Sequence, residues 1–427
     1  MNVLSLFSGC GGLDIGLEGH FWALKKSVKN EEWIEKAEGQ KVLLRPTGFK
    51  TVFANDIRPD AKRAWTNYFK DRDPNIYHLE SIVDLVKQAK AGKKTFPNNI
   101  DIVTGGFPCQ DFSVAGKRLG FNSMVGHDGS RIEAPTAENR GHLYMWMREV
   151  ISMVKPKMFI AENVKGLTNL GDVQKIIEHD FESAGYIVVP AKVMLAADYG
   201  VPQSRERVIF FGFDKERLTD DAAKALAMSI IPDAYDPYPA PTHRDRFVTC
   251  GDAFYGLEEP NQTNDPAQRK YSKAKYMGKH CQGQIEVNIN GISPTIRSEH
   301  HGNIEFRRLS AEHGGKHVEE LSKGLKERRL TVRECARIQT FPDNYEFIIP
   351  SSKASIGISA SNAYKLIGNA VPCLMAYNIA MNLKRKWSVY FKEESQNDSC
   401  KEGHEPKEFF RLGTENYRRS KFTGAQK

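Results

Sequence analysis

The stretch NVLSLFSGCGGLDIGLE, residues 2–18, decides the predicted fold. Its first six residues are mostly apolar, which predicts a buried strand, and the glycines at positions 9, 11 and 12 predict a turn directly after it. A helix is expected to begin by Asp14. Because a backbone turn and a helix N-terminus can approach a ligand closely, this turn is a candidate cofactor-binding loop.

The loop departs from the dinucleotide-binding pattern Gly-x-Gly-x-x-Gly. Gly9 and Gly11 match the first two glycines of that pattern, but the third position is Asp14. A smaller or less anionic ligand than a pyrophosphate is therefore favoured. The alternative is that the glycines only form a tight turn.

Four further apolar runs follow this first strand, with segments of helical period between most of them. The runs are TVFAND (51–56), DIVTGGF (101–107), KMFIAENV (157–164) and RVIFFGF (207–213). Residues 59–69 place Ala61, Ala64, Trp65 and Tyr68 on one helical face, and residues 142–155 do the same with Leu143, Trp146, Val150 and Met153. This alternation predicts an α/β fold with a doubly wound, mostly parallel sheet.

The second half of the chain has a different character. The alternation fades after Asp214, and residues 232–245 contain four prolines, which block helix and interior strand. We therefore predict a larger domain at 1–230 and a smaller, polar domain built for contact at 231–345. A return segment at 346–390 and a charged tail at 391–427 would follow. From about residue 384 the poor pattern predicts a peripheral helix or partial disorder.

Composition sets the broad class. The 427 residues are 40% hydrophobic, which suffices for a substantial core, and no segment is expected to span a membrane or to act as a signal peptide. The seven cysteines show no Cys-x-x-Cys pair and no zinc-ligand spacing, so reduced thiols, no metal and a cytoplasmic location are expected. The net charge of +8 suits a polyanionic partner without requiring one.

One cysteine stands where a ligand would bind. In GGFPCQDFS (105–113), Pro108 disfavours a helical conformation for Phe107, so the chain must turn just before Cys109. The thiol would then lie at the carboxyl ends of the strands, where open α/β sheets bind ligands. A nucleophilic role would require a lowered pKa. The alternative is a half-buried structural cysteine.

Other polar side chains are predicted at the same edge. Asp56 ends the second strand, where an acidic residue accepts hydrogen bonds from a ribose, so a nucleoside is implied. Glu162 and Asn163 end another strand and are expected to face one crevice, and Arg205 and Arg207 begin a further strand. Together with the thiol they would supply a nucleophile, a proton donor and a bidentate clamp. The alternatives are helix caps for the acids and a solvated edge for the arginines.

These motifs, in their order along the chain, resemble those of DNA (cytosine-5)-methyltransferases of the bacterial or phage restriction-modification type. The stretches that carry the resemblance are FSGCGGLDIGLE (7–18), GGFPCQDFS (105–113), ENVKGL (162–167), QSRERVIF (203–210), RRLTVRECARIQTFPDNY (328–345) and GNAVP (368–372). The resemblance implies a class I, Rossmann-like methyltransferase domain that binds S-adenosyl-L-methionine and releases S-adenosylhomocysteine. It also implies that residues 231–345 form a target-recognition domain.

The resemblance further implies a covalent reaction. Cys109, following Pro108, would add to C6 of a cytosine, and C5 would then take the methyl group. Glu162 would bond or protonate N3, and Arg205 would hold the O2 side of the ring. Asn163 would fix the loop that carries Cys109.

Cofactor contacts are implied in the same way. Phe7 and Ile57 would flank the adenine, and Asp56 would bind the ribose. The backbone of Gly9, Gly11 and Gly12 would approach the cofactor closely. Asn369 and Val371 would contact its methionine end. Where the family often has Gly-Asp-Ile for the adenine amino group, this chain has HLESIVDL (78–85), so Glu80 and Ser81 both remain candidates. The segment between Ser113 and Leu143 is longer than the usual catalytic loop.

The target base lies inside a duplex, so it must be flipped out, and double-stranded DNA is the expected partner. The expected DNA contacts are Gln110, Ser113, Arg207, Arg297 and Arg307, with His300 and His301 beside them. A monomer is expected, and functional pairing with a restriction endonuclease is compatible with the resemblance. The alternatives are a transfer-RNA cytosine-5 methyltransferase of the same fold and a catalytically silent DNA-binding relative.

Overall fold

A computed structural model describes residues 1–108, 126–128, 130–131, 142–169, 172–298, 304–352 and 356–392. Met1–Phe391 form one compact unit and Lys392–Lys427 form another. The description below concerns the first unit. Cys109, Gln110, Ser113, His300 and His301 lie outside the described residues.

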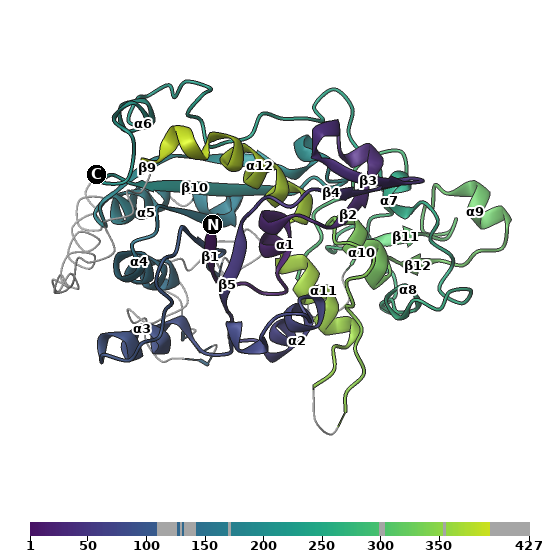
Figure 1. Ribbon diagram of the computed structural model, residues 1–427. Helices are drawn as coiled ribbons and strands as arrows, with labels where there is room; N and C mark the ends of the chain where they lie inside the picture. The colour runs from purple at the N-terminus through teal and green to yellow at the C-terminus, as the bar shows by residue number, and fades with distance from the viewer. Residues whose placement is uncertain are drawn as a thin grey trace, which may run out of the picture. The chain divides into compact units, whose positions relative to one another are not determined.

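A seven-stranded sheet forms the centre of this unit (Figure 1), in the order β6-β5-β1-β7-β8-β10-β9. Its strands are β1 (Asn2–Leu6), β5 (Lys50–Asn55), β6 (Tyr77–His78), β7 (Ile102–Gly105), β8 (Met158–Val164), β9 (Tyr186–Leu195) and β10 (Glu206–Asp214). The strands from β6 to β8 pair in parallel, and β10 pairs antiparallel with both β8 and β9. The predicted α/β fold with a mostly parallel sheet is therefore confirmed, and all five predicted strands are present; β6 and β9 were not predicted.

The register brings several strand ends to one edge of the sheet. Leu6 lies opposite both Asn55 and Gly105, and Gly105 lies opposite Ala161, so β5, β1, β7 and β8 reach this edge together. Because β10 runs antiparallel, it begins at this edge, with Arg207 opposite Val164. The residues that follow the parallel strands and those that open β10 are thereby gathered in one place.

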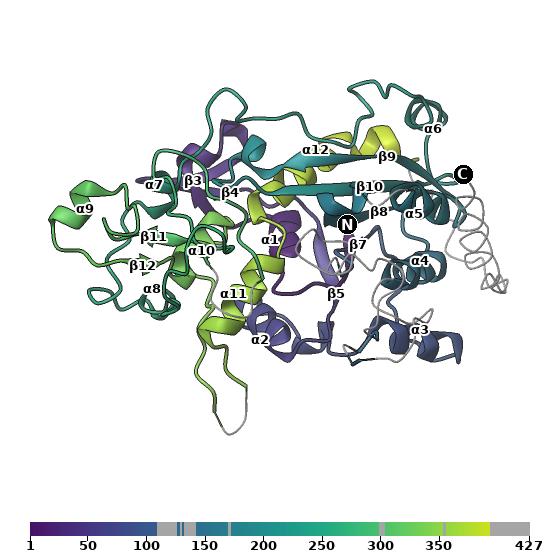
Figure 2. The ribbon, with the colours of Figure 1, turned by 180° about the vertical axis from the view of Figure 1, so that it is seen from behind.

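Helices cover both faces of the sheet, because alternate strand residues belong to two separate cores. Leu4, Val103 and Phe159 pack in the core formed with α3 (Ile82–Lys90), α4 (Leu143–Val154) and α5 (Val173–Glu182). Val3 and Ile102 pack in the core formed with α1 (Gly12–Glu18), α2 (Pro59–Tyr68), α6 (Asp220–Leu226) and α12 (Cys373–Tyr390). Figures 1 and 2 show α3, α4 and α5 in a row on one side. The helices predicted at 59–69 and 142–155 are present.

The two most distant helices in the chain, α1 and α12, pack against each other. A Cβ on Gly16 would lie 2.3 Å from the carbonyl oxygen of Cys373, so only glycine permits this approach. Helix α12 continues past residue 384 to Tyr390, whose side chain is fully buried. The end of α12 is therefore part of the core, so the prediction of a peripheral helix or partial disorder from about residue 384 does not hold for residues 384–390.

The stretch Ala360–Tyr390 is long and apolar enough to cross a membrane by length and composition alone, which the sequence analysis did not anticipate. It contains α11 (Ala360–Asn369) and α12. However, 89% of its most apolar window is buried inside the protein, as in the core helices of globular domains.

A small antiparallel sheet was not predicted. It consists of β2 (Trp22–Leu24), β3 (Ile34–Glu38) and β4 (Lys41–Leu44), in the order β2-β4-β3. Phe21 and Trp33 each contact the ring of Tyr377 edge-on, so aromatic packing anchors this sheet to α12.

The described part of the segment from 231 to 345, which we call the recognition segment, consists mostly of irregular backbone with a few short elements. They are α7 (Cys250–Phe254), α8 (Pro266–Arg269), β11 (Phe306–Arg308), α9 (Val318–Ser322), β12 (Arg328–Arg329) and α10 (Val332–Ile338). Figure 2 shows these elements on the opposite side from α3, α4 and α5. The domain boundary near residue 231 stays a prediction.

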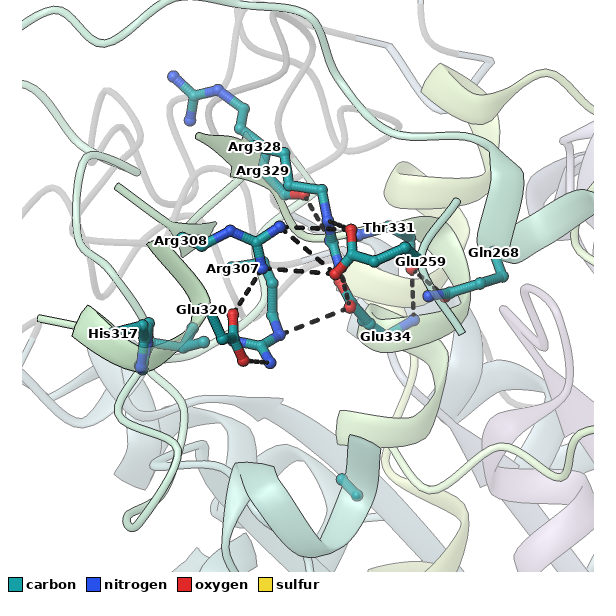
Figure 3. A network of polar contacts seen from close by, with 12 residues as sticks. Glu259, Gln268, Arg307, Arg308, His317, Glu320, Arg328, Arg329, Thr331 and Glu334 are labelled. Atoms are coloured by element: carbon teal, nitrogen blue, oxygen red, sulfur yellow. Dashed lines mark hydrogen bonds and ion pairs between the residues drawn. The ribbon is translucent and has the colours of Figure 1, made fainter. Parts of the chain in front are cut away.

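Paired charges hold the recognition segment together (Figure 3). Arg328 donates to both oxygens of Glu334 at 2.8 and 2.9 Å and to Glu259 at 3.0 Å. Arg308, only 1% exposed, is paired with Glu259 and Glu320. Since an unpaired buried charge costs several kcal/mol, these side chains depend on one another.

Candidate active site

A cavity of about 670 Å³ lies at the sheet edge described above. Of the predicted site residues, those that line it are Phe7, Gly9, Gly12, Asp56, Ile57, Pro108, Glu162, Arg205, Arg207, Arg297, Asn369 and Val371. The structure therefore brings the residues predicted for a cofactor and those predicted for a reaction into one space.

The loop from Phe7 to Gly12, which we call the cofactor loop, needs its glycines. Gly9 and Gly11 have φ values of 53° and 81°, in the left-handed region, and a Cβ on Gly11 would lie 2.7 Å from Cδ1 of Trp65. A Cβ on Gly12 would lie 2.3 Å from the carbonyl oxygen of Val371. Helix α1 begins at Gly12, as the sequence predicts.

Asp56 follows β5 and faces the cofactor loop. One carboxylate oxygen accepts a hydrogen bond from Gly9 N at 3.0 Å, and the other accepts one from Arg58 N at 2.9 Å. Burial raises the pKa of Asp56, against the effect of these hydrogen bonds. The next residue, Ile57, is 43% exposed, so an apolar surface lies beside an acceptor. This pairing suits a nucleoside.

Of the two candidates left open for the adenine end, Ser81 lines the cavity. Its Oγ lies 2.7 Å from Nδ1 of His127, which also lines the cavity. Glu80 instead accepts a hydrogen bond from Gln88 at 2.8 Å. His127 comes from the long segment between Ser113 and Leu143, and the sequence analysis assigned it no role.

Asn163 does not share the crevice of Glu162, in contrast to the expectation from the sequence. Its amide nitrogen donates to the carbonyl oxygen of Phe107 at 3.1 Å, and its side chain is buried. Successive strand residues point to opposite faces, which explains the difference from Glu162. Asn163 thus holds the chain two residues before Cys109.

Arg207 is the arginine that lies beside Glu162. Its Nε is 2.7 Å from Oε1 of Glu162, and both side chains are about 10% exposed. Burial raises the pKa of Glu162, while Arg207 and then Arg205 oppose that rise. A carboxyl group with a raised pKa keeps its proton to a higher pH than usual, as a proton donor requires.

Arg205 does not have the geometry of the clamp that the sequence analysis assigned to it. Its side chain is fully buried, and its guanidinium donates to the carbonyl oxygens of Ile296, Gly368 and Ala370 at 3.0, 2.8 and 2.9 Å. It therefore joins the recognition segment to the GNAVP motif. Arg205 lies just before β10 and Arg207 lies within it, two positions further on, so strand alternation alone does not distinguish the two arginines.

Cys10, a cysteine that was not predicted as a site residue, lines the cavity. Burial raises the pKa of its thiol to about 12, and the thiol lies 3.5 Å from the carbonyl oxygen of Leu366. Cys10 is therefore a protonated structural thiol and a poor nucleophile. Among the described residues, no cluster of three or more His, Cys, Asp or Glu side chains could hold a metal ion.

Comparison with known proteins shows to which family the chain belongs. A family model for C-5 cytosine-specific DNA methylases matches residues 1–385. The chain belongs to this family. The Type II methyltransferase M.BsuRI of Bacillus subtilis is 32% identical over 418 residues, which cover 94% of this chain and 83% of that protein.

Further relatives agree with this membership. The Type II methyltransferase M.BspRI of Lysinibacillus sphaericus is 31% identical, covering 93% of this chain and 85% of that protein. A solved structure of the S. pombe Dnmt2 methyltransferase has a TM-score of 0.53 at 16% identity and covers 90% of this chain, which supports the fold. The predicted DNA cytosine methylation is thus supported over the RNA alternative.

Two of the arginines predicted to bind DNA are engaged within the methylase. Arg307 pairs with Glu320 at 2.5 Å and lies 3.8 Å from Glu334, and its side chain is only 12% exposed (Figure 3). The prediction of a DNA contact at Arg307 is therefore not supported. Arg297 lines the cavity, and its guanidinium lies 3.1 Å from the buried Glu305.

The exposed cations lie elsewhere in the recognition segment. Residues 269–279, RKYSKAKYMGK, which we call the basic run, contain Arg269, Lys270, Lys273, Lys275 and Lys279. The first three of these line a groove of about 910 Å³ together with Lys326. The basic run is not among the predicted DNA contacts, although its density of cations interleaved with tyrosines is a usable signal for nucleic-acid binding.

Proposed function

We propose that this methylase transfers a methyl group from S-adenosyl-L-methionine to C5 of a cytosine flipped out of a specific duplex DNA sequence, with Cys109 as the nucleophile. One observation carries the proposal. A single cavity is lined by Asp56 and Ile57, which suit a nucleoside, and by Glu162 and Arg207, which suit a cytosine ring, with Pro108 at its wall.

The cavity fits the cofactor. Its volume of about 670 Å³ is within the usual range for small-molecule sites. Asp56 would accept hydrogen bonds from the ribose, Phe7 and Ile57 would flank the adenine, and Ser81 with His127 would bound the adenine end. Asn369 and Val371 would contact the methionine end. When bound, the cofactor supplies an electrophilic methyl group on a sulfonium.

The protein's part in the reaction is to activate the cytosine. The Cys109 thiolate would add to C6, and the displaced electron pair would move into the ring toward N3. Glu162, whose pKa is raised by burial, would give its proton to N3 as this charge develops. We assign the O2 side of the ring to Arg207 rather than Arg205, because Arg207 lies beside Glu162.

Methyl transfer and release of the enzyme would complete the reaction. C5 would bond to the methyl carbon as the carbon–sulfur bond of the cofactor breaks, which leaves S-adenosylhomocysteine. A water acting as base would remove the C5 proton, and the electron pair would form the C5–C6 double bond and expel the Cys109 thiolate from C6. N3 would then return its proton to Glu162. Asn163, bound to Phe107 O, would keep Cys109 in place throughout.

The biological setting follows from the relatives, whose names place them among Type II methyltransferases. We propose that this enzyme acts in the cytoplasm as a monomer and is paired with a restriction endonuclease that cuts the same sequence. To test the pairing, one would look for an endonuclease that cuts unmodified DNA but does not cut DNA that this enzyme has methylated.

Nucleoside mass spectrometry tests the reaction. DNA and transfer RNA would be taken from cells that lack their own cytosine methylation and express either the unmodified protein or Cys109→Ala. We expect 5-methylcytosine in the DNA only with the unmodified protein. Modified transfer RNA with unmodified DNA would favour the RNA reaction, and methylation by Cys109→Ala would refute the covalent step.

A further inference from the structure

Two buried tyrosines hold neighbouring carbonyl groups of the cofactor loop. The hydroxyl of Tyr77 donates to Gly9 O at 2.9 Å, and that of Tyr345 donates to Cys10 O at 2.7 Å. Both side chains are fully buried, and burial raises both pKa values well above the ordinary range. Both phenols therefore stay protonated and act as permanent donors.

The two tyrosines come from different parts of the molecule. Tyr77 belongs to β6 at the edge of the central sheet, whereas Tyr345 is 335 positions from Cys10 and ends the recognition segment. The Tyr345 ring stacks on Tyr68 of α2 at 5.1 Å and packs against Phe347 at 4.4 Å. Tyr345 thus reaches from the recognition segment into the floor of the cofactor site.

The main chain of Tyr345 is in turn tied to the rest of the recognition segment. Arg333 of α10 donates to Tyr345 O at 3.2 Å and pairs with Asp265 at 2.5 Å. Asp265 caps α8, accepting a hydrogen bond from Ala267 N at 2.8 Å. Helix α8 ends at Arg269, the first residue of the basic run.

A second link joins α10 to the basic run itself. Val332 N, at the start of α10, donates to Lys270 O at 3.0 Å, and Tyr271 forms a β-bridge with Thr331. The cations of the basic run form no ion pair with any residue in the described part of the chain, so they are free to meet phosphates. A shift of the basic run on DNA would therefore reach Tyr345 through α10.

We propose that Tyr345 is a positioning residue that couples the binding of DNA by the recognition segment to the binding of cofactor. The proposal rests on the proposed function, because it takes DNA and S-adenosyl-L-methionine as the two ligands. DNA on the basic run would fix α10 and Tyr345, and Tyr345 would fix the cofactor loop through Cys10 O. Coupling of this kind is reciprocal, so the cofactor would strengthen DNA binding by the same factor.

Tyr77→Phe provides a matched control for Tyr345→Phe, since each removes one hydroxyl from the same loop. The affinity of the full-length protein for S-adenosylhomocysteine would be measured by calorimetry, alone and with excess sheared unmethylated genomic DNA. We expect each variant alone to bind about five-fold more weakly, the usual effect of one buried hydrogen bond. DNA should tighten binding by at least about five-fold in the unmodified protein and in Tyr77→Phe, but less than about two-fold in Tyr345→Phe.

A second variant tests the same coupling in case the Tyr345→Phe protein does not fold. Asp265→Asn keeps a capping side chain on α8 and removes the charge that pairs with Arg333. We expect it to bind S-adenosylhomocysteine normally without DNA and to lose part of the tightening with DNA.

Several results would overturn the coupling: an unmodified protein whose affinity is the same with and without DNA, a Tyr345→Phe protein that keeps the full factor, or a Tyr77→Phe protein that loses as much. Unchanged coupling in Asp265→Asn would overturn the route through α10. Each of these results leaves the methyl-transfer assay untouched, whereas a protein that binds no S-adenosylhomocysteine at all would overturn the proposed function.

Discussion

Replacing Arg207 by methionine should change the pH dependence of methyl transfer. The substitution keeps an apolar side chain of similar length but removes the cation that lies 2.7 Å from the Glu162 carboxylate. Burial already raises the pKa of Glu162, and Arg207 is the main group that opposes this rise. Without Arg207, the pKa of Glu162 should therefore rise further.

The size of the effect follows from the contact. An opposite charge at this distance lowers a carboxyl pKa by about one to three units, and each unit corresponds to about 1.4 kcal/mol. Since Glu162 must carry a proton to act, the rate falls as the pH rises through its pKa. In Arg207→Met this alkaline fall should move upward by about one to three pH units. The maximal rate should drop about 10²- to 10³-fold, as when one charge-stabilising donor is removed.

The assay is transfer of labelled methyl groups to saturating DNA across a pH range. Lys192→Met is the control, because Lys192 on β9 pairs with Asp236 at 2.8 Å but is half exposed. An exposed pair contributes about 1 kcal/mol or less, so this variant should keep both the rate and the profile. An Arg207→Met enzyme with an unmoved profile and a normal rate would refute the assignment of Arg207 to the cytosine.

Three further predictions concern other parts of the protein. Burial raises the pKa of Asp14 to about 6 in spite of hydrogen bonds from Ser5 and Trp65, so stability should fall by about 3 kcal/mol as the pH rises from about 3.8 through 6. Asp14→Asn should abolish this fall in urea unfolding, and an unchanged slope would contradict the assignment. Asp56→Ala should weaken S-adenosylhomocysteine binding about ten-fold or more in calorimetry and leave DNA affinity within about two-fold; equal losses would exclude the ribose role. Replacing Lys270 and Lys273 by alanine should lower the salt dependence of DNA binding by about one unit of slope each, whereas Arg307→Gln should reduce stability without altering that slope.

The sequence predicts the sheet and the cofactor loop well because both depend on local patterns. Apolar runs bounded by glycine and proline mark β1, β5 and β7, and each strand lies where the pattern indicates. The end of β5 places Asp56 at the ligand edge for the same reason. Parallel strands that end in register carry their following residues to one place, so much of the site follows from strand order.

The errors concern contacts between segments far apart in the chain. Arg205 donates hydrogen bonds to the main-chain carbonyl groups of Ile296 and Gly368, which are 91 and 163 positions away in the sequence. Arg307 of β11 is paired because its strand lies near α9 and α10, which carry Glu320 and Glu334. No local sequence pattern identifies hydrogen-bond or ion-pair partners this far apart. The choice between a structural and a ligand-binding arginine could therefore not be made from the sequence.

The packing of α1 on α12 has a consequence for how the enzyme is made. A ribosome synthesises α1 first and α12 more than 350 residues later, so the nascent chain waits with the apolar face of α1 uncovered. Asn369 and Val371, which line the cofactor cavity, also emerge only after the recognition segment. The cofactor cavity is therefore completed only after the recognition segment has been synthesised, and a product that ended within that segment would lack both α12 and these two cavity residues.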